Sequence, residues 1–154
     1  MVGKSVAVAI SAAIGILFTG FAGSAAADED TRALVELPPM MQQHMLANMR
    51  DHLLALDEIL GDLAEGNIDA AASIAEKRLG MSSLSLHGAA QMAPFMPKAM
   101  GEIGTQMHHA ASRFVIVAQD AELNPGKAAQ HEVYRALRDI TQNCNACHQS
   151  YRIR

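Results

Sequence analysis

The last part of the chain repeats apolar side chains at alternating steps of four and three residues. The repeating positions are Val133, Leu137, Ile140, Cys144, Cys147 and Tyr151. This spacing is typical of one face of an α-helix, because residues three and four apart lie above one another on its surface. Both cysteines of the chain therefore belong to the face that such a helix turns toward a protein core.

The two cysteines belong to the run Cys144-Asn145-Ala146-Cys147-His148, close to the C-terminus. A Cys-x-x-Cys-His run is typical of covalent attachment of haem c. Thiols one helical turn apart can form two thioethers on one porphyrin edge, and the adjacent imidazole can bind the iron. The motif predicts one covalent haem c, held by Cys144 and Cys147, with His148 as the proximal iron ligand.

Three other uses of the cysteine pair fit less well. A structural zinc site takes four ligands, and the chain has no third cysteine to supply one. A redox-active Cys-x-x-Cys pair opens a helix after a strand, whereas this pair ends a helical pattern. A disulfide between helical neighbours three residues apart has poor geometry.

Residues 1–27 are predicted to be a signal peptide. Lys4 precedes an apolar run over residues 6–21, and small residues at 25–27 offer a cleavage site. We therefore expect a periplasmic protein without a membrane segment after cleavage; the alternative is an uncleaved N-terminal anchor. Residues 28–154 carry 11 basic and 16 acidic residues, a net charge of −5. No Lys/Arg run is present, so nucleic acid is a poor partner.

The remainder of the chain is predicted to form four helical segments, preceded by a mobile lead-in at residues 28–37. Pro38-Pro39 begins the first helix and Gly66-Asn67 ends it. The second begins at Asn67 or Asp69, runs through Leu79 and weakens toward residue 88. Two prolines make residues 93–97 a connection. The third helix spans about 97–122, and the fourth follows a stop signal at 124–126.

Four amphipathic helices with short turns predict an all-α domain over residues 38–154, an antiparallel up-down-up-down four-helix bundle. In that topology the first half of the first helix lies beside the end of the fourth. Residues 40–52 would then cover the haem.

In these features the chain resembles the class II c-type cytochromes, the cytochrome c-prime family. The resemblance rests on the single motif near the C-terminus, the helical pattern and the tail Cys-His-Gln-Ser-Tyr-Arg at 147–152. It implies thioethers at Cys144 and Cys147, His148 on the iron, and Tyr151 and Arg152 in the haem surroundings. It also implies a possible homodimer, since members often pair through the first two helices.

Family members differ in what faces the other side of the iron. An apolar side chain of the first helix leaves the iron open to small gases, whereas a methionine there makes it six-coordinate. Counting from either end of the first helix favours Met49, with Met45 as the second choice. His44, His52 or an open site are the remaining alternatives. Met41 or Met45 stands where the family has an arginine, so the propionate contact is unassigned.

We expect an electron carrier, because the methionines at the distal positions favour it over a gas-binding protein. We expect no enzyme, because no Ser/His/Asp or paired-carboxylate arrangement suggests hydrolytic chemistry. Its partners would be redox proteins with basic docking patches. The alternative is a five-coordinate cytochrome c-prime that binds NO or CO. A weaker alternative is copper handling, since thioethers and imidazoles select Cu(I). It would use a His/Met group: His87, Met92, Met96, Met100, Met107, His108 and His109. Core-filling methionines together with surface histidines explain that group better, because methionine commonly fills cores.

Overall fold

Helices dominate the part of the chain that the computed structural model describes, residues 29–154. The predicted signal peptide, residues 1–27, lies outside the described residues. Residues 31–154 form one compact unit, and the prediction of an all-α chain is confirmed. Among the described helices, none combines the length and the apolar character needed to cross a bilayer.

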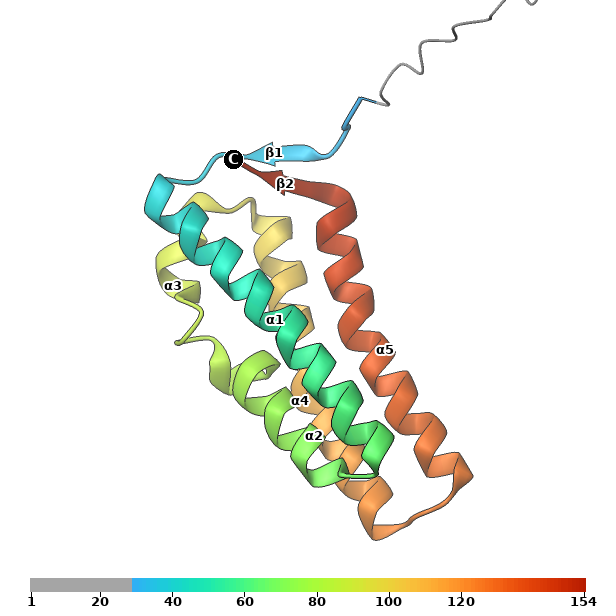
Figure 1. Cartoon of the computed structure of the whole chain (residues 1–154). Helices are drawn as coiled ribbons and strands as arrows, with labels where there is room; N and C mark the ends of the chain where they lie inside the picture. Colours follow the sequence, from blue (N-terminus) through green and yellow to red (C-terminus); the bar gives the residue numbers. More distant parts are fainter. Residues whose placement is uncertain (1–28) are drawn as a thin grey trace, which may run out of the picture. The chain divides into compact units, whose positions relative to one another are not determined.

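The three long helices begin and end close to the predicted residues. They are α1 (Pro39–Glu65), α4 (Lys98–Leu123) and α5 (Lys127–Ser150) (Figure 1). Proline opens α1, where a missing N–H costs no helical hydrogen bond. Gly66 closes it in the left-handed conformation (φ 80°) that glycine adopts without strain.

The middle of the chain is less regular than a single second helix. It comprises α2 (Ile68–Ile74), a π-helical turn (Ala75–Leu79), a 3₁₀ turn (Met81–Ser83), α3 (Ala89–Met92) and a second 3₁₀ turn (Ala93–Phe95). Two hydroxyls bond to backbone carbonyls where the π-helical turn ends: Ser82 Oγ donates to the Glu76 carbonyl within the turn (2.9 Å), and Ser83 Oγ donates to the carbonyl of Gly80, the residue that follows it (2.7 Å). The predicted helix therefore stops near Leu79, and the predicted connection at 93–97 is mostly a 3₁₀ turn.

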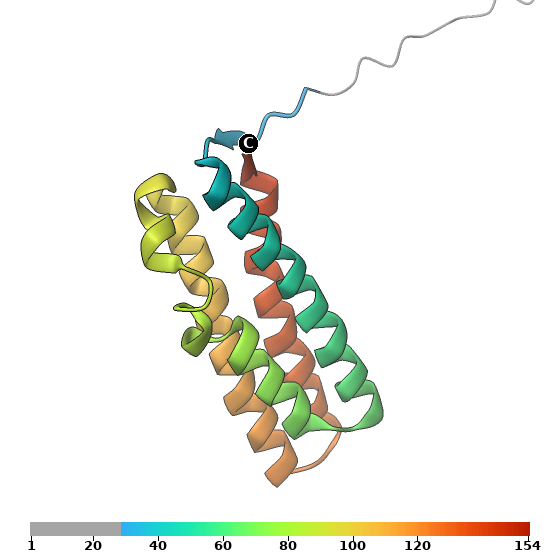
Figure 2. The same cartoon turned by 60° about the vertical axis from the view of Figure 1, so that its left-hand side comes forward.

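Two short parallel strands correct the expectation of a mobile lead-in at residues 28–37. Strand β1 (Ala33–Val35) pairs with β2 (Tyr151–Ile153), at the end of the unit where α1 begins (Figures 1 and 2). Two further backbone hydrogen bonds, Leu37 N–H to the Arg154 carbonyl and Arg154 N–H to the Val35 carbonyl, extend the pairing (3.1 Å each). Val35 and Leu37 are buried, and this burial opposes fraying of the segment. The pair ties the start of α1 to the end of α5.

Buried apolar side chains form two separate clusters. The central core joins α1, α2, α4 and α5, with Ile59, Leu79, Phe114 and Ile140 among its buried members. The second, which we term the methionine cluster, lies against the strand pair. Its buried members are Val35, Leu37, Met92 and Met100, and its margin comprises Met41, Met45, Met96, Cys147, Tyr151 and Ile153.

Candidate functional site

The two cysteines lie where the two apolar clusters meet α5. Cys144 packs against the central core, and Cys147 packs against the methionine cluster. Both thiols are free and partly buried, and burial raises the pKa of each. This placement agrees with the prediction that both cysteines lie on the inward face of the last helix. A planar apolar group attached to both sulfurs would therefore contact both clusters.

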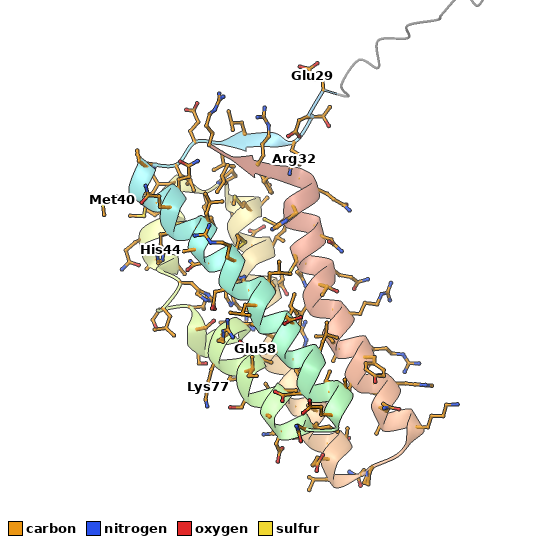
Figure 3. The ribbon with its side chains drawn as sticks, in the orientation of Figure 1. Glu29, Arg32, Met40, His44, Glu58 and Lys77 are labelled. Atoms are coloured by element: carbon orange, nitrogen blue, oxygen red, sulfur yellow. The ribbon has the colours of Figure 1, made fainter. Side chains whose placement is uncertain are left out.

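His148 directly follows Cys147 in α5, and its side chain is exposed. Its backbone carbonyl accepts a hydrogen bond from Arg32 Nη1 (3.2 Å). Arg32 precedes β1, and Figure 3 shows it beside the end of α5. The N-terminal strand segment thus also holds the end of the helix that carries the motif.

The first helix brings methionines to the same end of the unit. Met41 and Met45 pack against the methionine cluster, as Cys147 does. Met49 is partly buried, but it is not among the residues of either cluster. Met45 therefore packs against the same cluster as Cys147, whereas Met49, which the count from the helix ends favoured, does not.

Tyr151 and Arg152 lie in β2 rather than in the last helix. Tyr151 is partly buried at the margin of the methionine cluster, and Arg152 Nε donates to the Arg32 carbonyl (3.4 Å). The strand follows the helix that carries the motif, and the implied role of both residues in the haem surroundings stays a prediction. Neither position could be assigned to a strand from the helical repeat alone.

A mainly apolar groove runs between α1 and α5 and was not expected from the sequence. Its volume is about 810 Å³. Its lining residues are Arg50, Leu53, Leu54, Leu56, Asp57 and Leu60 from α1 and Tyr134, Leu137, Arg138 and Thr141 from α5. Thr141 precedes Cys144 by one helical turn, so the groove ends close to the cysteine pair. Helix α5 packs chiefly on α4 and α1 chiefly on α2, which leaves this space between them.

The expected His/Met group does not stay together: Met107 belongs to the central core and His109 is exposed. Met92, Met96 and Met100 belong to the methionine cluster, whereas His87 packs its ring against those of His52 and His108. The sequence analysis missed this histidine group because its members come from three separate segments. Among residues 29–154, no three His, Cys, Asp or Glu side chains are already arranged around a common metal position.

The chain was compared with protein-family models, with curated proteins and with solved structures, and none of them matches it.

Proposed function

We propose that this protein is an exported c-type cytochrome that carries single electrons on one covalently bound haem. The observation that carries the proposal is the placement of two free thiols, Cys144 and Cys147, on the inner face of one helix at the junction of two apolar clusters. A buried thiol pair followed by His148 supplies the donor set that haem c requires.

The residues around the pair fit the group. Cys144 and Cys147 would hold it through thioethers, and His148, which is exposed, would turn inward to bind its iron. The methionine cluster and the α1–α5 groove offer the apolar surfaces that a porphyrin needs. Arg50 and Arg138 line the groove, and their charges suit the propionates. The bound haem supplies one-electron redox chemistry.

A methionine of α1 would be the second axial ligand. Met49 is favoured by its position along the helix, but Met45 shares the methionine cluster with Cys147, and on this ground we rank Met45 first. The two histidine alternatives have other surroundings: His44 Nε2 donates to the His87 carbonyl (2.9 Å), and His52 lies among imidazoles. A thioether ligand favours ferrous iron and raises the reduction potential.

The finer architecture we propose is the antiparallel up-down-up-down bundle. Its four members would be α1, α2 with the π-helical turn, α4 and α5. Packing between successive members, α1 on α2, α2 on α4 and α4 on α5, supports this order. We further propose that the protein works in the periplasm after loss of residues 1–27 and meets redox partners through basic patches, either as a monomer or as a homodimer.

Optical spectra of the exported protein, oxidised and reduced, with and without carbon monoxide, test the ligand assignment. Sharp low-spin bands that the gas leaves unchanged support a methionine-ligated electron carrier. Met45→Leu should then convert the spectrum to high-spin and let carbon monoxide bind, while Met40→Leu should change nothing, because Met40 is 81% exposed (Figure 3).

Two other outcomes have definite meanings. If Met49→Leu, and not Met45→Leu, opens the iron, the ligand is Met49 and the electron-carrier proposal stands. If the unaltered protein is already high-spin and binds carbon monoxide, the gas-binding alternative replaces the proposal.

A further inference from the structure

Three histidines from distant parts of the sequence form one group, in which two members are buried and the third is partly buried. His52 comes from α1, His87 from the turn before α3, and His108 from α4. Their ring centroids are 4.6 Å (His52–His87), 5.3 Å (His87–His108) and 6.0 Å (His52–His108) apart. We term these residues the histidine triad.

One member of the triad has a ring nitrogen without a partner. His52 is only 8% exposed, and its Nε2 is buried with no hydrogen bond. A buried polar atom left unsatisfied is costly, and native proteins retain few of them. The unpaired nitrogen therefore points to a ligand that would satisfy it.

Hydrogen bonding fixes the ring of His108, and permits the ring of His87, in the tautomer that leaves Nε2 as an electron-pair donor. His108 Nδ1 lies 2.7 Å from the Leu79 carbonyl, which can only accept, so Nδ1 carries the proton. Ser83 Oγ gives its own hydrogen to the Gly80 carbonyl, so at 3.4 Å it can accept from His87 Nδ1. Metal-binding histidines are oriented in this way, by a hydrogen bond from the nitrogen that does not bind the metal.

Two side chains of α1 also hold the backbone of His87 in place. His44 Nε2 and Asn48 Nδ2 both donate to the His87 carbonyl, at 2.9 and 3.0 Å. His44, Asn48 and His52 are four residues apart, so they share one face of α1. The same face of α1 thus carries one member of the triad and positions another.

We propose that the histidine triad binds one borderline transition-metal ion, of the Zn²⁺ or Cu⁺ class, through three Nε2 atoms. Imidazoles bound at about 2.0–2.1 Å around one tetrahedral ion have ring centroids roughly 5 Å apart, and the triad spans this separation. Nitrogen-only donors disfavour Mg²⁺ and Ca²⁺, which require oxygen ligands. No group of three His, Cys, Asp or Glu side chains among the described residues is yet placed to hold a metal ion. Binding therefore requires the ring of His52, whose Nε2 makes no hydrogen bond, to turn about its side-chain torsions, while the Nδ1 contacts keep the rings of His87 and His108 in place. The site is separate from the haem motif and does not depend on it.

Calorimetric titration of the isolated, chelator-treated full mature protein tests this inference, with Zn²⁺ in air and Cu⁺ under anaerobic conditions as probes. One equivalent of at least one ion should bind, and Mg²⁺ should not. His87→Gln should weaken binding by more than about tenfold. His109→Gln is the matched control, because His109 is exposed and adjacent to a triad member; it should bind as the unaltered protein does.

Zn K-edge absorption should report three nitrogen neighbours at about 2.0 Å, a readout that the haem iron does not affect. His87 is only partly buried, so the His87→Gln variant remains informative even if His108→Gln fails to fold. Absence of stoichiometric binding by both ions, or equal affinity in the His87→Gln and His109→Gln variants, would overturn the inference. The absorption spectrum of the same samples reports the haem separately, so failure of either proposal is distinguishable.

Discussion

His52 shows how burial sets the chemistry of a single residue. Desolvation, reinforced by the neighbouring His87 and His108, lowers the pKa of His52 from 6.5 to about 4. Burial likewise lowers the pKa values of His87 and His108. The folded protein therefore keeps the triad neutral at physiological pH, the state in which imidazole can bind a metal ion.

This pKa shift predicts acid sensitivity of the metal-free protein. The unfolded chain takes up protons below pH 6.5, whereas folded His52 resists protonation until about pH 4. The contribution of neutral His52 to the free energy of unfolding is therefore fully present above pH 6.5 and is lost as the pH falls from 6.5 to 4. His52 alone should lower the free energy of unfolding by about 2 kcal/mol between pH 7 and pH 5. Urea unfolding with chelator present should show this loss. It should shrink in His52→Leu and persist in His131→Leu, whose histidine is exposed. A flat profile in the unaltered protein would contradict this expectation.

Gly88 is a second residue whose surroundings predict the effect of a substitution on stability. Its φ is +62°, and a Cβ there would lie 2.9 Å from His44 Nε2. Gly88→Ala should cost about 1–2 kcal/mol from the left-handed backbone alone, and it should also disturb the His44 bond to the His87 carbonyl. Gly61→Ala, with open space at its Cβ and a helical backbone, should instead stabilise by about 0.5–1 kcal/mol. Chemical denaturation of both variants checks the prediction, and equal effects would refute it.

At the scale of elements, the sequence predicted the long helices well because strong local signals bound them. Pro39, Gly66 and Asn124-Pro125-Gly126 interrupt the apolar repeat at the helix ends, and each acts through its own backbone. The strand pair escaped prediction because its hydrogen bonds join residues more than a hundred positions apart. The histidine triad escaped for the same reason: only tertiary packing brings α1, α4 and the turn before α3 together.

The strand pair should contribute measurably to stability. Leu37, 7% exposed, packs in the methionine cluster beside β1, so Leu37→Ala should destabilise by about 2–3 kcal/mol. Leu34 lies on the adjoining strand but is 37% exposed, and Leu34→Ala should cost less than about 1 kcal/mol. Thermal unfolding of the two variants compares them directly. Similar losses would mean that the segment is not packed as described.

At the scale of the molecule, charge should govern encounters with partners. Residues 28–154 carry a net charge of −5, and exposed charges act over about 8–10 Å at ordinary ionic strength. Oxidation of the reduced protein by a cationic metal complex should slow as salt rises, and oxidation by an anionic complex should quicken. Stopped-flow rates measure both, and rates independent of salt for both reagents would contradict electrostatic steering.

The central claim is the covalent haem, and the mass of the exported protein after unfolding in acid tests it most directly. Unfolding removes any haem held only by its iron ligands but leaves thioether-bound haem on the chain. We expect the mass of the chain from residue 28 plus one haem, and the mass of the bare chain when Cys144 and Cys147 are both replaced by alanine. A bare chain from the unaltered protein, exported by a strain that matures other c-type cytochromes, would contradict it.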